Sequence, residues 1–274
     1  MDNYLFFDID GTLSHGHGGT IPERNKELLK ELREKNDKVF ICTGRAYCTG
    51  QVDVEQDGFI GSMGAYAEFR GKTIIEYPID QETVKKFIAL CDKYKICLMM
   101  QGKDKCWSND WQISFFDKLS IFMPKKAKEK FKKSSYYVSG RNKIGEYNGE
   151  KVYKFDMMYT LRSNKKGFLK DFPEELKLVT ILSQFRGLFE GCEAVRKDVS
   201  KGRTAIEVTK LLNGDVNNTY GFGDSSNDLE LIQMVKHGIA MGNATKDIKQ
   251  VAEFITDKAD RNGIYKALVH YGLI

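Results

Sequence analysis

A short apolar run that ends in two closely spaced carboxylates constrains this chain more than any other feature. Tyr4–Phe7 is aromatic and apolar, which predicts a short buried strand. Asp8 and Asp10 follow directly, and Gly11 permits a tight turn after them. Ligands collect at the carboxyl ends of strands in a parallel sheet flanked by helices. A helix N-cap or a solvated turn is the simpler alternative, but two carboxylates at a buried strand end favour a site.

Length and charge limit the classes of protein that the chain can belong to. The 274 residues are enough for a sizeable core and for two domains. Hydrophobic residues make up 41% and charged residues 30%, which is ordinary for a globular protein. Lys and Arg outnumber Asp and Glu by 43 to 38, a net charge of +5. So mild an excess suits an anionic small-molecule substrate and does not require nucleic acid as a partner.

Targeting signals and metal-binding cysteine motifs are missing from the sequence. The amino terminus has no basic region followed by an apolar stretch, and no apolar run reaches the roughly 20 residues that span a bilayer. The six cysteines form no Cys-x-x-Cys pair, which favours buried free thiols in a reducing compartment over a zinc site. His15 and His17 lie in a glycine-rich loop, where a chance pair is the preferred interpretation. We therefore expect a cytoplasmic protein without a membrane partner.

The segment after the first strand predicts a strand–helix–strand unit. Pro22 precedes a helix over Glu23–Lys35, and a second buried strand follows at Lys38–Cys42. Such a unit implies parallel strands and a right-handed crossover. It places Thr43 and Gly44 at the same sheet edge as the first strand's acids. A hydroxyl and backbone N–H groups at this kind of turn can bind an anion.

The same pattern returns near the end of the chain. Lys201 precedes a helix over Arg203–Leu212, and the strand Thr219–Phe222 leads into Gly-Asp-Ser-Ser-Asn-Asp. Asp224 and Asp228 in that segment are four residues apart, so they share a face of the helix that it opens. Further predicted elements are strands at Gly238–Met241 and Glu253–Thr256 and helices at Lys246–Ala252 and Ile264–Tyr271.

The middle of the chain has a different, α+β character. Its densest basic run, Lys125–Lys133, has Ala127 and Phe131 on one face and is interpreted as a solvated helix, not as a nucleic-acid or membrane surface. The predicted strands are Tyr66–Phe69, Thr73–Tyr77, Ile96–Gln101, Gln112–Phe122, Lys151–Thr160, Lys177–Leu182 and Phe185–Glu190, and the predicted helices are Gln81–Tyr94, Lys125–Lys133 and Lys165–Asp171.

Taken in order, these segments resemble the four motifs of the haloacid dehalogenase superfamily. The motifs are Asp-x-Asp-Gly-Thr at Asp8, Thr-Gly-Arg at Thr43, the Lys at Lys201 and Gly-Asp-x-x-Asn-Asp at Asp224. About 155 residues separate Arg45 from the Lys motif, which is enough for a domain. An insertion at that point resembles the capped Cof-type members, subclass IIB. One departure is Met63-Gly64-Ala65, where these relatives usually have Asn-Gly-Ala.

The resemblance implies a Rossmann-like, doubly wound α/β core with an inserted α+β cap. Residues 1–61 and 190–274 would form the catalytic core, and residues 62–189 would form the cap that sets substrate specificity. The cap carries no motif, so it does not name the substrate, and the oligomeric state stays open.

The resemblance also implies a role for each motif residue. Asp8 would be the nucleophile and Asp10 the general acid and base. A Mg²⁺ ion would be bound by the Asp8 and Asp224 carboxylates and the Asp10 carbonyl, with Asp228 contributing directly or through a hydrogen bond. The groups expected to hold the phosphoryl oxygens are Thr43, Gly44, Lys201 and Asn227.

The implied activity is that of a phosphoric monoester hydrolase: a Mg²⁺-dependent phosphatase that works through an aspartyl phosphate. Small phosphorylated metabolites such as sugar phosphates are the implied substrates. Two alternatives stay open. One is a phosphosugar mutase of the same superfamily, and the other is a non-catalytic phospholigand-binding regulatory protein.

Overall fold

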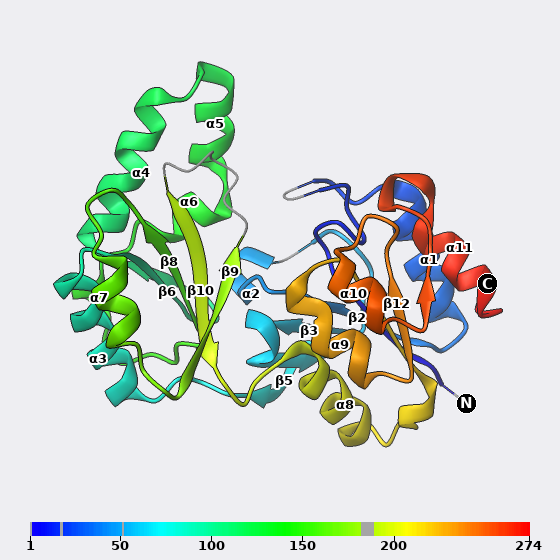
Figure 1. Ribbon diagram of the computed structural model, residues 1–274. Helices are drawn as coiled ribbons and strands as arrows, with labels where there is room; N and C mark the ends of the chain where they lie inside the picture. Colours follow the sequence, from blue (N-terminus) through cyan, green and yellow to red (C-terminus); the bar gives the residue numbers. More distant parts are fainter. Residues whose placement is uncertain (1, 17–18, 51, 182–188) are drawn as a thin grey trace. The chain divides into compact units, whose positions relative to one another are not determined.

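The computed structural model describes residues 2–16, 19–50, 52–181 and 189–274. The chain divides into two compact units (Figure 1). The first unit consists of Met1–Arg45, Val52–Glu76 and Val199–Ile274, and the second of Ala46–Gln51 and Tyr77–Asp198. The units differ from the expected domains in three segments. Ala46–Gln51 and residues 190–198 belong to the second unit, and residues 62–76 belong to the first.

The first unit is built on an eight-stranded sheet with the order β13-β12-β11-β1-β2-β3-β4-β5. Strands β13 to β3 in this order are parallel, and β4 and β5 add an antiparallel hairpin at one edge. The central strands are buried throughout, as expected when helices cover both faces of a parallel sheet. The strands are β1 (Tyr4–Phe7), β2 (Lys38–Cys42), β3 (Gly58–Gly61), β4 (Tyr66–Phe69), β5 (Lys72–Glu76), β11 (Thr219–Gly223), β12 (His237–Ala240) and β13 (Phe254–Ile255).

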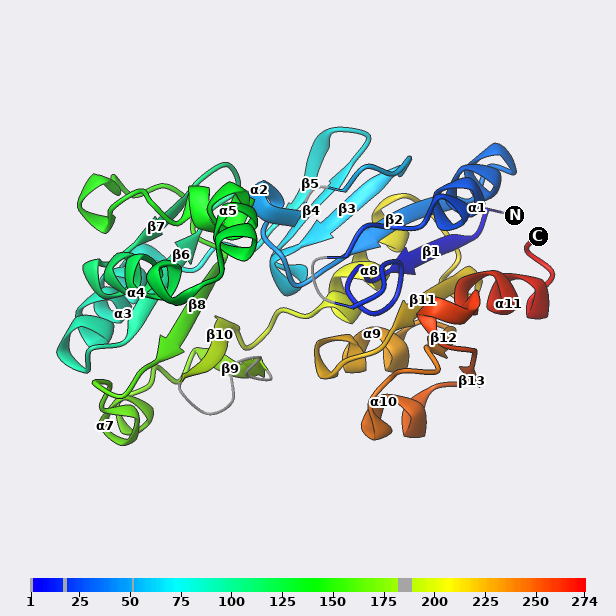
Figure 2. The ribbon, with the colours of Figure 1, turned by 90° about the horizontal axis from the view of Figure 1, so that it is seen from above.

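Helices lie on both faces of this sheet (Figure 2). Helices α1 and α11 pack together, and α8, α9 and α10 form a second group on the opposite face. This arrangement confirms the expected doubly wound α/β class. The helices are α1 (Glu23–Glu34), α8 (Lys201–Leu211), α9 (Leu229–Met234), α10 (Lys246–Val251) and α11 (Gly263–His270).

The second unit contains a five-stranded antiparallel sheet with the order β7-β6-β8-β10-β9. Its apolar core includes Phe87 of α3, Phe155 of β8 and Phe168 of α7, and the rings of Phe87 and Phe155 are stacked 4.2 Å apart. The elements are α2 (Tyr47–Gly50), α3 (Gln81–Lys93), β6 (Cys97–Gln101), β7 (Cys106–Ser108), α4 (Asp110–Phe122), α5 (Lys125–Lys133), α6 (Ser135–Ser139), β8 (Lys154–Tyr159), α7 (Lys165–Lys170), β9 (Leu176–Ile181) and β10 (Glu190–Arg196).

One predicted strand is wrong. Residues Gln112–Phe122 form most of helix α4. Its buried residues Gln112, Phe116 and Ser120 are four apart, which is helical spacing, but the apolar residues between them suggested a buried strand. The predicted strand Phe185–Glu190 lies mostly outside the described residues, and β10 begins at its last position.

Two expectations about composition can be compared with the structure. Cys42, Cys91, Cys97, Cys106 and Cys192 are buried free thiols, as expected. Across the described ranges, no helix is both long enough and apolar enough to cross a membrane.

Candidate active site

The parallel strands of the first unit bring the separate motifs to one edge of the sheet. Phe7 of β1 pairs with Ile41 of β2 on one side and with Phe222 of β11 on the other. The backbone N–H of Asp8 extends this register by donating to the carbonyl of Phe222 over 3.0 Å. The residues that follow these three strands therefore lie side by side. They are Asp8 after β1, Thr43 after β2 and Asp224 after β11, and each belongs to one of the sequence motifs.

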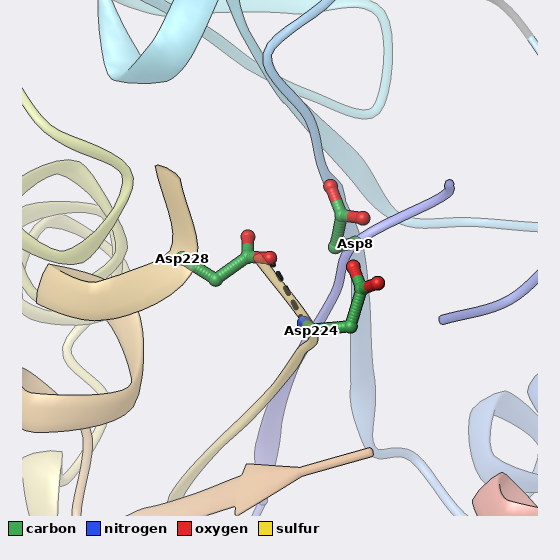
Figure 3. A group of neighbouring side chains, drawn as sticks. All are labelled: Asp8, Asp224 and Asp228. Carbon is green, nitrogen blue, oxygen red and sulfur yellow. Dashed lines mark hydrogen bonds between the residues drawn. The ribbon is translucent and has the colours of Figure 1, made fainter. Parts of the chain in front are cut away.

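Three carboxylates form a compact acidic group at this edge (Figure 3). Asp8, Asp224 and Asp228 each place a carboxylate oxygen within 4.8 Å of the other two. Asp228 lies at the end of the short helix Ser226–Asp228, and its Oδ2 accepts the backbone N–H of Asp224 over 3.0 Å. This bond closes the loop after β11 and aligns the two acids of that motif. The predicted acids Asp8, Asp224 and Asp228 are thus brought together.

Lys201 supplies a positive charge inside this group. Its Nζ donates to Asp8 Oδ1 over 2.7 Å and to Asp228 Oδ1 over 2.6 Å, and its side chain is fully buried. Burial disfavours the charged amine, but the charges of Asp228 and Asp8 outweigh that cost and raise the pKa of Lys201. The lysine therefore stays charged and links strand β1 to the loop after β11.

One lysine does not balance three carboxylates. Burial, followed by the charge of Asp228, raises the pKa of Asp8 to about 8, although Lys201 lowers it. Burial and Asp228 likewise raise the pKa of Asp224 to about 7. Burial and mutual repulsion thus disfavour the charged forms of both acids when no metal is bound. A cation bound among the three carboxylates would relieve this repulsion.

The donor set of this site fits a hard divalent metal ion. All of the ligand atoms are carboxylate oxygens, which Mg²⁺ prefers over the nitrogen and sulfur ligands of zinc. The Oδ1 atom of Asp224 is buried and has no hydrogen-bond partner within the described chain, so it is available as a ligand. The residues that could hold the ion through side chains are Asp8, Asp224 and Asp228.

The side chain of Asp10 lies outside this acidic group and is held by an arginine. Arg45 binds it in a bidentate manner, with Nε 2.8 Å from Oδ2 and an Nη 2.5 Å from Oδ1. Arg45 was not among the predicted site residues. The sequence signal that could have identified Arg45 is its position directly after Thr43-Gly44. This position follows the end of β2, and the end of β2 lies beside the end of β1.

The predicted phosphate-binding residues also lie close to one another. Thr43 is buried, and its hydroxyl accepts the backbone N–H of Arg45 over 3.2 Å. A Cβ atom at Gly44 would lie 3.1 Å from Asn227 Nδ2, so the Gly44 backbone closely approaches that amide. The Asn227 Oδ1 atom accepts a hydrogen bond from the Ser225 hydroxyl, so the NH₂ group of Asn227 points away from Ser225. Backbone and amide donors are thus gathered next to the acids.

Asn243 is a second site residue that was missed. Its Nδ2 donates to the Gly11 carbonyl over 2.8 Å and to Asp224 Oδ2 over 3.2 Å. Gly11 has φ of +84°, and a Cβ atom there would overlap Asp224. Asn243 lies three residues after the end of strand β12, and the sequence motifs assigned it no role. Its contacts indicate that it positions Asp224 against the turn after β1.

The segment that departs from the family pattern has an unusual backbone. Met63 has φ of 60° and ψ of 27°, in the left-handed region that asparagine tolerates better than most residues. This conformation gives a physical reason for Asn at the position in relatives. Gly64 follows with φ of +101°, and its carbonyl accepts the Thr204 hydroxyl over 2.7 Å. The segment therefore braces the start of helix α8, which carries Lys201.

Comparison with known proteins agrees with this geometry. Residues 5–268 match the family model of haloacid dehalogenase-like hydrolases. YkrA of Bacillus subtilis, provisionally named a phosphatase, is 27% identical over 281 residues that cover all of both chains. YwtE of the same organism, named a 5-amino-6-(5-phospho-D-ribitylamino)uracil phosphatase, is 26% identical over 95% of this chain and 94% of its own. The solved structure of the subclass IIB sugar phosphatase BT4131 is 25% identical, has a TM-score of 0.74 and covers 99% of this chain and all of its own.

The chain belongs to the haloacid dehalogenase-like hydrolases. The family resemblance drawn from the four motifs, including its subclass, is therefore confirmed. The expected enzyme class, a phosphatase of the haloacid dehalogenase type, is confirmed by the same model and these named relatives.

Proposed function

We propose that the protein is a Mg²⁺-dependent phosphatase that hydrolyses small phosphorylated metabolites through an aspartyl phosphate on Asp8. The observation that carries the proposal is the buried contact between Lys201 and Asp8 within a group of three acids. A carboxylate that attacks a phosphate dianion meets electrostatic repulsion. The lysine and a bound Mg²⁺ ion would both reduce it, and the ion would also polarise the phosphoryl oxygens.

The chain's own residues would perform two steps. In the first, an Asp8 carboxylate oxygen bonds to phosphorus while the bond to the ester oxygen breaks, and Asp10 gives that oxygen its proton. In the second, a water oxygen bonds to phosphorus, the bond to Asp8 breaks, and Asp10 takes the proton of the water. The bidentate contact with Arg45 would hold Asp10 in one orientation between its proton donation in the first step and its proton uptake in the second.

The remaining residues would bind and orient. The Thr43 hydroxyl, the Gly44 N–H, the Asn227 amide and Lys201 would donate to the phosphoryl oxygens. Asp8, Asp224 and the Asp10 carbonyl would hold the Mg²⁺ ion. Asp228 would act mainly through its bonds to Lys201 and to the Asp224 backbone.

Sugar and sugar-alcohol phosphates are the proposed substrates. YwtE and BT4131 are named for a ribityl phosphate and for sugar phosphates, and the present chain resembles both over nearly its whole length. The buried free thiols favour the cytoplasm as the compartment.

The test is phosphate release from a panel of sugar and sugar-alcohol phosphates with Mg²⁺. Asp8→Asn is expected to abolish release while the circular dichroism spectrum stays that of the wild type. Asp53→Asn, an identical change at a fully exposed acid, serves as the matched control and is expected to keep full activity. Near wild-type turnover by Asp8→Asn would disprove the nucleophile assignment, and an isomerised sugar phosphate as product would indicate a mutase.

A further inference from the structure

Each of the three clustered acids has at least one carboxylate oxygen engaged by a donor of the protein. The Lys201 Nζ donates to Asp8 Oδ1 over 2.7 Å and to Asp228 Oδ1 over 2.6 Å. The Oδ2 atom of Asp228 accepts the backbone N–H of Asp224 over 3.0 Å, drawn in Figure 3, and that of Ser225 over 3.2 Å. These donors limit the number of carboxylate oxygens that are open to a cation.

Asn243 engages the third acid, Asp224. Its Nδ2 donates to Asp224 Oδ2 over 3.2 Å, while Asp224 Oδ1 is buried and has no hydrogen-bond partner among the described residues. The Asn243 Oδ1 accepts the backbone N–H of Ala259 over 3.0 Å. Because a backbone N–H only donates, this contact fixes the amide with its NH₂ group towards Asp224. Asn243 thus occupies one oxygen of Asp224 and leaves the other for a metal ion.

The turn that carries Asn243 is held in place by backbone contacts. The Met241 N–H donates to the Gly223 carbonyl over 3.0 Å, and the Thr245 N–H donates to the Asp224 carbonyl over 2.9 Å. These bonds tie the turn after β12 to the loop after β11 on both sides of Asn243. A substitution of Asn243 therefore removes the amide and leaves the backbone around Asp224 in place.

We propose that Asn243 is a positioning residue that sets the metal selectivity of the site: it holds Asp224 as a ligand with one oxygen and thereby favours Mg²⁺ over Ca²⁺. The inference rests on the proposed function, which requires Mg²⁺ at this site. Mg²⁺ takes an octahedral shell, keeps several waters and is bound through one or two carboxylates. Ca²⁺ takes about six to eight oxygens and accepts carboxylates that bind through both oxygens. Without the amide of Asn243, both oxygens of Asp224 would be free to bind one ion, which suits Ca²⁺.

The experiment measures the dissociation constants of Mg²⁺ and of Ca²⁺ by titration calorimetry of the full chain, without substrate. Asn243→Leu removes the amide. Asn243→Asp removes the donor to Asp224 but keeps an oxygen that accepts the Ala259 N–H. Asn217→Asp is the matched control, because the Nδ2 of Asn217 also donates to an aspartate, Asp215, over 3.0 Å. That exposed pair lies before β11, at the end of the strand opposite to the site.

The readout is the ratio of the Ca²⁺ dissociation constant to the Mg²⁺ dissociation constant. We expect both Asn243 variants to lower this ratio about tenfold, a usual effect of losing a residue that orients a metal ligand. Asn217→Asp should leave the ratio unchanged, and circular dichroism checks that each variant is folded. If Asn243→Leu does not fold, Asn243→Asp decides, because it keeps the contact with Ala259.

An unchanged ratio in either folded Asn243 variant would overturn the inference, as would a wild-type protein that binds the two ions equally well. The proposed function is tested separately by phosphate release. A wild-type protein that prefers Mg²⁺ but releases phosphate from no ester would remove the phosphatase function, and the ratios would still decide the role of Asn243.

Discussion

Lys201 is the residue on which the electrostatics of the active site depend. Its buried ammonium group contacts Asp8 and Asp228, which come from strand β1 and from the loop after β11. A buried charge that loses its partner is far more costly than the pair itself is favourable. The contribution of Lys201 to stability is therefore expected to exceed that of any exposed lysine of the same helix.

Lys201→Met is predicted to destabilise the metal-free protein by about 3–5 kcal/mol, because two buried carboxylates lose their counter-charge. Lys210→Met, on the exposed side of the same helix, should change the stability by about 0.5 kcal/mol or less. Denaturant unfolding in the presence of EDTA measures both values. Equal effects of the two substitutions would contradict the assigned role.

The raised pKa values of Asp8 and Asp224 predict how Mg²⁺ and pH act together. In the metal-free folded protein these acids have pKa values of about 8 and about 7, above the ordinary value of 3.8. Between the ordinary pKa of 3.8 and these raised values, the folded state holds protons that the unfolded state has already released. The contribution of the two acids to stability therefore falls as the pH rises across that range and levels off above about pH 8. Metal ligands must be deprotonated, so the stabilisation by Mg²⁺ should grow from about pH 6 to about pH 8.

Thermal unfolding with Mg²⁺ and with EDTA, repeated across that pH range, measures this coupling. Phosphatase activity should be lost in EDTA and restored by Mg²⁺. Asp224→Asn is expected to flatten the pH dependence of the Mg²⁺ effect. A Mg²⁺ effect that shrinks as the pH rises would contradict the assignment of these acids as ligands.

At the scale of single elements, helix α4 shows what a capping residue contributes. Asn109 precedes the helix, and its Oδ1 accepts the N–H of Gln112, which caps the helix. The same atom accepts the N–H of Leu98, and the Nδ2 donates to the Ile96 carbonyl. One side chain therefore joins the helix to strand β6. An N-cap asparagine followed by an acid was the sequence signal that could have corrected the strand prediction.

Asn109→Ala is predicted to destabilise the second unit by about 2–4 kcal/mol, because the helix cap is lost and a buried N–H is left unpaired. Asn164→Ala is the matched control, since Asn164 caps helix α7 through the N–H of Gly167. Its expected cost is about 1 kcal/mol. Urea unfolding followed by tryptophan fluorescence compares the two variants. A smaller loss for Asn109→Ala than for Asn164→Ala would show that the contacts with β6 add nothing.

At the scale of the whole molecule, the two units have separate sheets and separate cores. Units of this kind are expected to unfold in separate transitions. Both tryptophans of the chain, Trp107 and Trp111, lie in the second unit, and the proposed metal ligands lie in the first. The two units can therefore be followed by different signals.

Mg²⁺ is predicted to raise the unfolding midpoint of the first unit and to leave the tryptophan-detected midpoint unchanged, because a ligand stabilises only the unit that binds it. Tryptophan fluorescence reports the second unit, and far-ultraviolet circular dichroism reports both. Asp8→Asn should remove most of the Mg²⁺ effect. A single transition that shifts equally in both signals would mean that the units unfold together.

Much of the fold and of the acidic group could be predicted because the pattern that specifies them is local. The strand Tyr4–Phe7, the helix Lys125–Lys133 and the motif acids all follow from residues near one another in the chain. The interpretation of Gln112–Phe122 failed because a mixed apolar run fits a buried strand and a buried helix alike. The bounds of the inserted unit differ from the expected ones because the residues of β4 and β10 do not show which sheet each strand joins, and only the pairing in the folded chain decides it.

The sequence by itself determined the strands and helices of the first unit and the motif residues at their ends, because hydrophobic spacing and turn residues act over a few positions. Only the tertiary structure decided which of those ends meet. The contact of Arg45 with Asp10, the hydrogen bonds from Asn243 to Gly11 and Asp224, and the ion pair of Lys154 with Glu193 join residues that are 19 to 232 positions apart in the sequence. Such contacts depend on strand order and register, which arise from the packing of the whole sheet and leave no local pattern.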